Sequence, residues 1–342
     1  MVAATTGRPN RDGRARRASP LRVGRHARGR TVDYKAFADR QIERITKRVG
    51  GGKAISALSG GVDSSVCTVL AHRAIGNQLK VVFIDDGLMR QDEPQEVKAA
   101  FARLGIPVTV IRAAGTFFKA LKGKTDPEKK RKAFRHTFYK VFGKAVRESG
   151  AHFLVQGTIA ADILETRKGV KTQHNVLDQI GISAKRGYGF HVIEPLKALY
   201  KPGVRQVGRA LGLPRHLYER MPFPGPGLAT RCLGECTPKR IAVVRHACRI
   251  VEEETEGVKK FQAFAVLLAD QATGMTKDGR RRFGDLIAVR VVNSEKAVKA
   301  TATRLPWATL MTIQKRIYKE IPSATKVLYD LSPKPPSTIE YI

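Results

Sequence analysis

The sequence predicts an α/β fold in which a parallel sheet, covered by helices on both faces, is followed by a smaller α+β domain. Short, apolar, β-rich runs alternate with helix-length segments up to about residue 211, and this alternation is typical of a parallel sheet with crossover helices. The segment 221–236, "MPFPGPGLATRCLGEC", then introduces prolines and glycines that neither a helix nor a central strand accommodates. We therefore expect a basic arm at 1–33, the sheet domain at 34–221 and the second domain at 222–342.

The sheet domain is expected to begin with an amphipathic helix, because Phe37, Ile42 and Ile45 recur near one face of "DYKAFADRQIERITKRVG". In such sheets ligands bind beyond the carboxyl ends of the strands. The polar residues that follow the early strands, "SGGVDSS", "DDGLMR" and "QGT", are therefore expected to form a site. The expected strands are 54–59, 80–85, 108–113, 152–157 and 191–196, and the expected helices are 63–76, 94–104, 127–149 and 201–211.

The second domain has apolar runs without regular alternation, which favours an α+β arrangement. No internal repeat is visible, and no run of 18 or more apolar residues predicts a membrane-spanning helix. The expected helices are 238–254 and 306–320, and the expected strands are 261–269, 285–292, 326–331 and 338–342.

Net charge is the most unusual feature of the composition. The chain carries +33, of which the first 33 residues, with nine arginines and two aspartates, contribute +7. This arm lacks apolar periodicity and is expected to be disordered. The charge on the remainder has two interpretations, a nucleic-acid partner or a site for phosphorylated substrates, and net charge alone does not separate them.

The cysteines indicate a reducing, cytoplasmic setting. Cys67, Cys232, Cys236 and Cys248 are too few and too unevenly spaced for a disulfide framework. Cys232 and Cys236 lack a second ligand pair at metal-binding spacing, so no zinc site is predicted.

The stretch "ALSGGVDSSVC", residues 57–67, has the pattern of a phosphate-binding loop. A strand ends in Ser-Gly-Gly and leads directly into a helix. Glycine lets backbone N–H groups approach an anion, and the helix N-terminus supplies further donors and a positive dipole end. The Walker pattern G-x-x-x-x-G-K-[ST] and the dinucleotide pattern G-x-G-x-x-G are both absent here. Asp63 has two interpretations at this stage, a helix N-cap or a holder of Mg²⁺ against a polyphosphate.

The loop resembles that of the N-type ATP pyrophosphatases, which cleave ATP between its α- and β-phosphates. More narrowly, residues 35–342 resemble the ATP-pyrophosphatase subunit of the GMP synthases, in particular that of the two-subunit, archaeal-like type. The matching segments include "LSGGVDSSV", "VFIDDGLMR", "PFPGPGLATRCLGE" and "KVLYDLSPKPPSTIEYI". The resemblance implies an adenine nucleotide alpha hydrolase-like sheet domain followed by a dimerisation domain.

The family reaction converts xanthosine 5′-monophosphate (XMP) to GMP in purine biosynthesis. ATP adenylylates the xanthine 2-oxygen, pyrophosphate leaves, and ammonia displaces AMP. No enzyme nucleophile is required, so catalysis is expected from positioning and charge neutralisation. The resemblance assigns Asp63 to Mg²⁺, Lys201 to the phosphates and Asp85, or Asp86, to the adenosine side of ATP. It assigns the phosphate cradle to the loop residues Ser59, Gly60, Gly61, Val62, Asp63, Ser64 and Ser65.

The XMP site is implied to be shared with the second domain, through Arg231, Lys334 and Glu340. Asp162 and Glu165 are further candidates for magnesium or substrate-loop contacts, although acids at that spacing are commonly only solvated. The lid segment departs from the family: the usual His-His-Asn is here Gln173-His174-Asn175. His174 is still expected to hydrogen-bond or move a proton.

No cysteine precedes Cys67, so we expect ammonia to come from solution or from a separate glutamine amidotransferase subunit. The resemblance also implies a homodimer. Two alternatives are kept at this stage, a tRNA-modifying ATP pyrophosphatase and a non-catalytic nucleic-acid-binding protein on this scaffold. The first would explain the charge but lacks the paired or catalytic cysteines such enzymes usually use, and the intact loop argues against the second.

Overall fold

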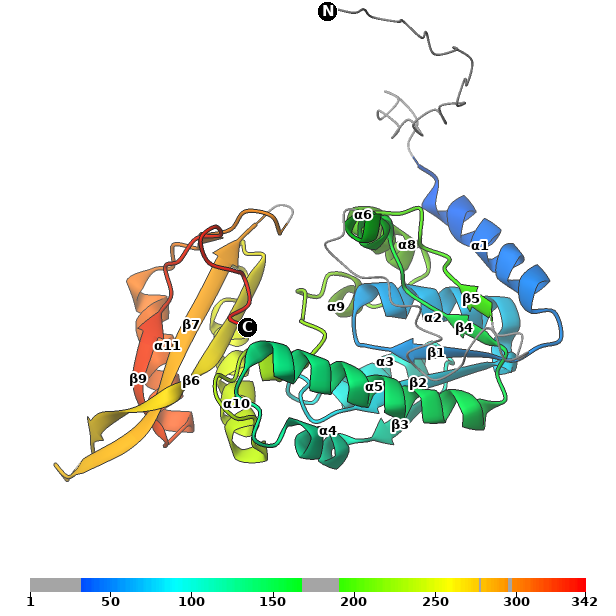
Figure 1. Cartoon of the computed structure of the whole chain (residues 1–342). Coiled ribbons are helices and arrows are strands. Elements are labelled where there is room, and N and C mark those ends of the chain that lie inside the picture. Colours follow the sequence, from blue (N-terminus) through cyan, green and yellow to red (C-terminus); the bar gives the residue numbers. More distant parts are fainter. Residues whose placement is uncertain (1–31, 168–190, 277, 295–296) are drawn as a thin grey trace, which may run out of the picture. The chain divides into compact units, whose positions relative to one another are not determined.

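The part of the chain from β1 to β5 forms a five-stranded parallel sheet with the order β3-β2-β1-β4-β5 (Figure 1). The computed structural model describes residues 32–167, 191–276, 278–294 and 297–342. The strands are β1 (Ala54–Leu58), β2 (Leu79–Asp85), β3 (Val108–Arg112), β4 (Phe153–Val155) and β5 (His191–Ile193).

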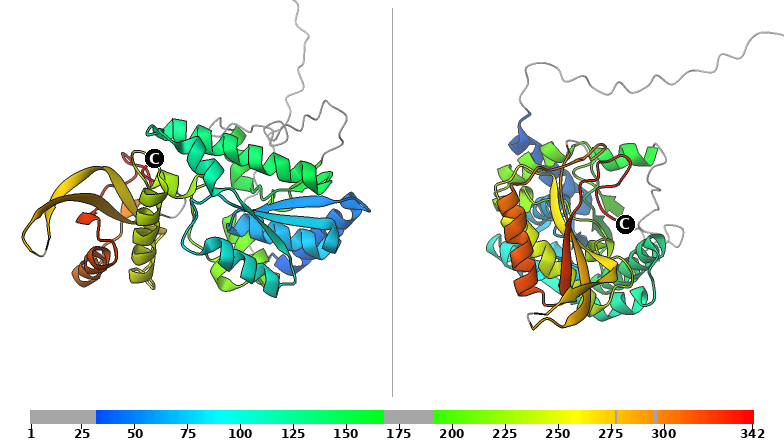
Figure 2. Two further views of the ribbon diagram at one scale, coloured as in Figure 1. Left: turned by 90° about the horizontal axis from the view of Figure 1, so that it is seen from below. Right: turned by 90° about the vertical axis from the view of Figure 1, so that its left-hand side faces the viewer.

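Helices cover both faces of this sheet, and the side chains of β2 show how. Val81 and Phe83 belong to a core shared with α1 (Tyr34–Val49), α2 (Val62–Ile75), α3 (Glu93–Arg103) and α8 (Lys201–Ala210). Val82 and Ile84 face the opposite core, with α4 (Ala114–Leu121) and α5 (Pro127–Ser149). Figures 1 and 2 show α5 on the face opposite α1 and α2. Because successive strand residues point to opposite faces, a strand buried on both sides reads as the continuous apolar run seen in "KVVFI".

The order of the strands fixes where a ligand can bind. From β1 the chain moves outward through β2 to β3 and then returns to the other side of β1 with β4. The connections therefore diverge at the carboxyl ends of β1 and β4, which is where open parallel sheets leave a crevice. The loop 59–61 follows β1, and Gly157 follows β4. A Cβ on Gly157 would lie only 3.1 Å from the Ser64 nitrogen at the start of α2, so glycine permits this close approach.

The second half forms a mixed four-stranded sheet covered by helices. β6 (Gln262–Met275) and β7 (Arg281–Asn293) pair in antiparallel fashion, β8 (Thr301–Ala302) pairs with β7, and β9 (Ala324–Tyr329) runs parallel to β7. The helices are α10 (Pro238–Glu254) and α11 (Trp307–Glu320). The fold class expected from the sequence, a parallel α/β sheet followed by a smaller α+β part, is confirmed.

Most predicted elements are present, with differences in length and number. The two long strands of the second sheet extend well beyond the predicted 261–269 and 285–292. Helix α4 was not predicted, and neither were the short elements α9 (Arg215–Tyr218), η3 (Gly227–Thr230) and β8. The helix α6 (Ala160–Arg167) follows β4 directly. No helix of the described residues is long and apolar enough to span a membrane.

The predicted strand at 338–342 is wrong, because an arginine takes the hydrogen bonds that a neighbouring strand would supply. Arg290 is fully buried in β7, and its guanidinium donates to the carbonyl oxygens of Thr338 at 2.7 Å and Ile339 at 2.9 Å. The same group pairs with Asp330 at 2.5 Å. The chain end is therefore held by one buried cation rather than by a ladder of backbone bonds.

This predicts that Arg290→Met detaches the chain end. Removing one partner of a buried ion pair costs about 3 kcal/mol or more, and the carbonyls of 338 and 339 lose their donors. We expect a lower melting temperature and faster amide hydrogen exchange in 330–342. Arg281→Met, an exposed arginine of the same strand, is the control. Unchanged exchange in 330–342 would show that other contacts hold this segment.

Candidate functional site

Hydrogen bonds from its own serine hydroxyl groups fix the conformation of the loop after β1. The Ser59 and Ser64 hydroxyls lie 3.0 Å apart, Ser64 accepts from the Ser59 nitrogen at 3.1 Å, and its hydroxyl donates to the Gly61 carbonyl at 3.0 Å. The N-cap residue of α2 is Gly61. The first N–H groups of α2 have no partner within the helix, and they begin where this loop ends. The conformation of the loop backbone therefore does not depend on a bound anion.

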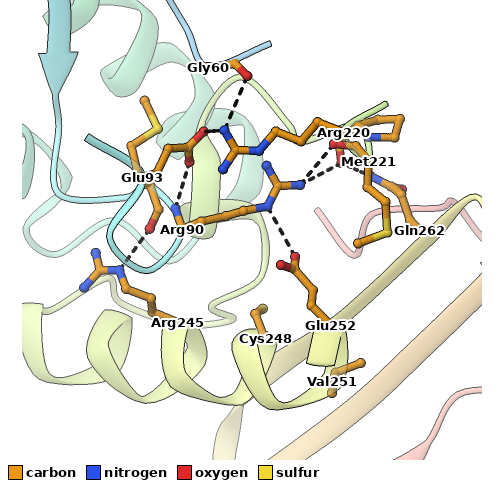
Figure 3. Close-up of polar contacts among 12 residues, drawn as sticks. Gly60, Arg90, Glu93, Arg220, Met221, Arg245, Cys248, Val251, Glu252 and Gln262 are labelled. Carbon is orange, nitrogen blue, oxygen red and sulfur yellow. Dashed lines mark hydrogen bonds and ion pairs between the residues drawn. The ribbon is translucent and has the colours of Figure 1, made fainter. Parts of the chain in front are cut away.

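Gly60 occupies a position that no other residue fits. Its φ is +72°, in the region that favours glycine. A Cβ at this position would overlap the Glu93 Oε1 atom. Glu93 is almost completely buried, and it pairs with Arg220 at 2.9 Å and accepts from the Arg90 backbone nitrogen at 3.1 Å. Arg220 also reaches the Gly60 carbonyl at 3.5 Å (Figure 3).

Asp63 and Lys201, 138 residues apart in the sequence, form an ion pair. The Lys201 Nζ lies 2.5 Å from Asp63 Oδ2. Burial raises the pKa of Asp63, and the attraction of Lys201 works in the opposite direction. The other carboxylate oxygen, Oδ1, is buried and has no hydrogen-bond partner among the described residues. Asp63 lies in the first turn of α2, no side chain caps this helix, and the capping interpretation is therefore wrong.

These groups line one cavity of about 260 Å³. Residues 58–63 form one wall, Lys201 and Arg205 of α8 line it as well, and the segment 220–225 closes another side. Of the predicted cradle, Ser59, Gly60, Gly61, Val62 and Asp63 line the cavity. Ser64 instead holds Ser59, and Ser65 is fully buried, with a hydroxyl that has no partner within the described residues. A cavity with a glycine loop, a helix N-terminus, several cations and the acids Asp63, Asp86 and Glu93 suits a polyphosphate with a metal ion.

The residues present fit Mg²⁺ only together with a ligand. Among the described residues, no group of three or more His, Cys, Asp or Glu side chains could hold a metal ion by itself. The orphaned Asp63 Oδ1 atom offers one carboxylate ligand. Mg²⁺ usually binds through one or two carboxylates, with phosphate oxygens and waters completing its coordination.

The two acids after β2 differ in what they face. Asp85 accepts from the Gly87 nitrogen at 3.1 Å and does not line the cavity, whereas Asp86 lines it, is almost fully buried, and accepts from the Leu88 nitrogen at 2.7 Å. Burial raises the pKa of Asp86 to about 7. Both acids therefore organise the turn, and Asp86 is the one in contact with the site.

The structure brings Arg231 and Glu340 together, but not with Lys334. Arg231 is 1% exposed, its Nε and Nη2 atoms donate to Glu340 at 3.0 and 2.9 Å, and its guanidinium lies over the rings of Phe223 and Phe264. Burial opposes the charge on Arg231, but Glu340 outweighs it and raises the arginine's pKa. Lys334 donates to the Ala297 carbonyl at 2.8 Å. The two candidates that meet therefore neutralise each other.

Several predicted residues cannot be placed in the site. His174, with Gln173 and Asn175, lies outside the described residues. Asp162 accepts from the Ile159 nitrogen at 3.1 Å, and its charge contributes to the raised pKa of Asp63. The side chain of Glu165 is outside the described part.

Sequence reasoning missed Arg205, Glu93 and Arg220. A signal for Arg205 was available, because it lies one turn after Lys201 on the same predicted helix. Glu93 and Arg220 had no such signal, because their roles follow from packing against Gly60.

A second cavity, of about 390 Å³, shares Arg90, Arg220 and Met221 with the first. Arg90 pairs with Glu252 of α10 at 3.3 Å and donates to the Met221 carbonyl at 3.1 Å, and Arg245 of α10 donates to the Met89 carbonyl at 2.9 Å (Figure 3). These arginines are occupied by protein acceptors. The cavity therefore lies where residues 85–93 pack against α10, and we assign it no ligand.

Comparisons with known proteins identify two family models, one for each part of the chain, and relatives that match most of its length. The family "NAD synthase" matches residues 36–225, and "GMP synthase C terminal domain" matches residues 249–341. The chain is 49% identical over 311 residues to the B-type subunit of the glutamine-hydrolyzing GMP synthase of Archaeoglobus fulgidus, covering 91% of this chain and 100% of that protein. The proteins of the same name from Methanopyrus kandleri and Pyrococcus furiosus are 48% and 47% identical, each over 90% of this chain and 99% and 97% of the relative.

Gly60→Ala is predicted to disrupt the loop. A left-handed backbone costs a non-glycine residue about 1–2 kcal/mol, and the overlap with buried Glu93 adds to it. We expect a loss of about 2 kcal/mol or more in stability, together with weaker ATP binding, measured by thermal unfolding and calorimetry. Gly61→Ala is the matched control, because φ there is −81° and the added Cβ meets only the Ser59 hydroxyl at 3.3 Å. Equal effects of the two substitutions would contradict this account.

Asp86→Asn is predicted to flatten the dependence of stability on pH. Between about pH 4 and 7 the unfolded chain ionises this carboxyl while the folded chain keeps its proton, so raising the pH through this window lowers the stability of the folded wild type. The variant lacks this loss, so its free energy of unfolding relative to wild type should rise between pH 5 and 8 by about 1–3 kcal/mol, measured by denaturant unfolding at each pH. Asp85→Asn controls for removing a carboxyl from the same turn. Parallel profiles for Asp86→Asn and wild type would show that Asp86 ionises normally.

Proposed function

Because this chain belongs to the family of these GMP synthase subunits, we propose that it is the synthetase subunit of a GMP synthase. The reaction is the conversion of ATP, XMP and ammonia to AMP, diphosphate and GMP through an adenylyl-XMP intermediate, in purine biosynthesis. The observation that carries the proposal is the cavity where the glycine loop, the Asp63–Lys201 pair and α8 meet. Such a site suits an ATP-using ligase that forms a C–N bond.

The protein's part in the first half-reaction is positioning and charge neutralisation. The backbone of residues 59–63 would receive the β- and γ-phosphates, which leave together as pyrophosphate. Lys201 would supply positive charge as negative charge accumulates on the leaving group. Asp63 would hold Mg²⁺ through Oδ1, and the ion would shield the phosphate charges. Asp86, rather than Asp85, is the better placed of the two acids to meet the nucleoside part of ATP.

The residues assigned to XMP could bind it only if the contact between Arg231 and Glu340 is broken. Arg231 can reach a phosphate only after Glu340 has left it, because both oxygens of Glu340 and the two aromatic faces enclose the guanidinium. We propose that XMP competes with Glu340 for Arg231, and that Lys334 contributes from the same C-terminal segment. His174 is proposed to act from the segment that the structure does not describe.

The partners follow from the family. The name of the relatives, a glutamine-hydrolyzing enzyme in subunits, supports a separate glutamine amidotransferase subunit that supplies ammonia. A homodimer through the second domain is proposed, and exposed apolar side chains support it. All but two of the large hydrophobic residues exposed in the described part lie within 275–331, including Phe283, Trp307 and Leu331. The cytoplasmic setting, the boundaries 34–221 and 222–342, and contact of the arm with nucleic acid stay predictions.

One assay tests the proposal. Purified protein with ATP, XMP, ammonium and Mg²⁺ should release AMP and GMP in equal amounts, and omission of XMP should stop ATP cleavage. ATP cleavage that is independent of XMP, or that depends on tRNA instead, would refute it. The tRNA-modifying alternative has no support among the relatives.

Asp63→Asn should lower XMP-dependent AMP formation by about 100-fold or more, because the site loses the charge that holds the metal and balances Lys201. Folding should be preserved, since Asp63 does not cap α2. Asp39→Asn, an exposed acid of α1, is the control. A large drop in melting temperature for Asp63→Asn would instead assign the residue a mainly structural role.

A further inference from the structure

Among the described residues, four cationic side chains line the first cavity, and three of them are already paired with acids. Arg90 pairs with Glu252, Lys201 with Asp63, and Arg220 with Glu93. Arg205 is different. Within the described residues it makes no ion pair, and its Nε atom is buried without a hydrogen-bond partner.

The position of Arg205 directs it to the same ligand as Lys201. The two residues lie four apart in α8, so they share one face of the helix. Both line the cavity, and the charge of Arg205 acts on the carboxyl of Asp63. Arg205 therefore lies within electrostatic reach of the residue at the centre of the site.

A buried donor without a partner is costly for a protein to keep. Such a group loses its hydrogen bonds to water and gains none in return. A planar guanidinium presents several N–H donors in a geometry that matches phosphate oxygens. The glycine loop and the N-terminus of α2 line the same cavity and favour the same class of ligand.

We propose that Arg205 is a polyphosphate-binding residue, and that it receives the anion while Lys201 is still held by Asp63. In the metal-free protein the pair Asp63–Lys201 is neutral, so among the described cations of the cavity wall Arg205 is the one without an acidic partner. The proposal deepens the proposed function and rests on its phosphate site, but it requires neither XMP nor ammonia.

The test is binding of inorganic pyrophosphate without metal. Calorimetry in EDTA is carried out on the full-length chain, on Arg205→Gln, and on Arg209→Gln. Arg209 lies one turn further along α8 and is exposed, so its substitution removes the same charge from the same helix. We expect Arg205→Gln to weaken pyrophosphate about tenfold or more, equal to about 1.4 kcal/mol, and Arg209→Gln to change it less than about twofold.

The melting temperature separates binding from structure. Because the Nε atom has no partner to lose, Arg205→Gln should be as stable as wild type or more stable. If Arg205→Gln unfolds, Arg205→Lys provides the second test. Lysine keeps the positive charge but lacks the planar arrangement of N–H donors, so this variant should still bind pyrophosphate at least about threefold more weakly than wild type.

Three outcomes decide the matter. Weak binding by Arg205→Gln with unchanged stability supports the proposal. Equal binding by wild type and Arg205→Gln overturns it and leaves the proposed function intact. A wild type that binds no pyrophosphate, with or without Mg²⁺, overturns the phosphate site itself and with it the proposed function.

Discussion

The site depends on a single ion pair between a carboxylate at the start of α2 and an ammonium at the start of α8. Asp63 follows β1, and Lys201 begins a helix that comes after β5, at the far end of the strand order. Only a parallel sheet whose connections diverge beside β1 brings the starts of these two helices to one edge. The pair fixes the distance across the crevice and balances a partly buried acid. The other oxygen of Asp63, Oδ1, has no hydrogen-bond partner among the described residues, and it is the atom proposed above to hold Mg²⁺.

The glycine loop is not an isolated feature of the sheet domain, because buried charges connect it to the second half of the chain. Glu93 packs against Gly60 and forms an ion pair with Arg220. Arg90 forms an ion pair with Glu252 of α10, and Arg245 of α10 donates a hydrogen bond to the Met89 carbonyl in the segment after β2. These contacts form a continuous series of charged side chains between the loop and α10. The same contacts explain part of the high arginine content: these side chains bind protein carbonyls and carboxylates rather than presenting their charge to a partner.

The sequence was informative wherever function depends on local geometry, and it was silent where function depends on packing. The strand ends and the glycine loop could be predicted, because each is written in a short segment with a defined period or turn, whereas the role of Lys201 came from the family resemblance and stays a prediction. The contact of Glu93 with Gly60 could not, since nothing in "DEPQEV" indicates which loop it meets. The strand predicted at 338–342 failed for a related reason. Its β-branched pattern is real, but the single side chain of Arg290 satisfies the backbone that a strand would have paired.

The chain end links the order of the second domain to the proposed substrate site. Arg290 holds the carbonyls of Thr338 and Ile339, and the next residue, Glu340, closes over Arg231. Separating Arg231 from Glu340 without a replacement would leave a buried guanidinium uncompensated, which is strongly unfavourable. A phosphate dianion, like a carboxylate, is an anion that can accept two hydrogen bonds from one guanidinium, so in the proposed exchange it would compensate Arg231 where water would not. Because Arg290 holds the carbonyls of Thr338 and Ile339, displacement of the Glu340 side chain from Arg231 and Gln262 would not by itself release the chain end.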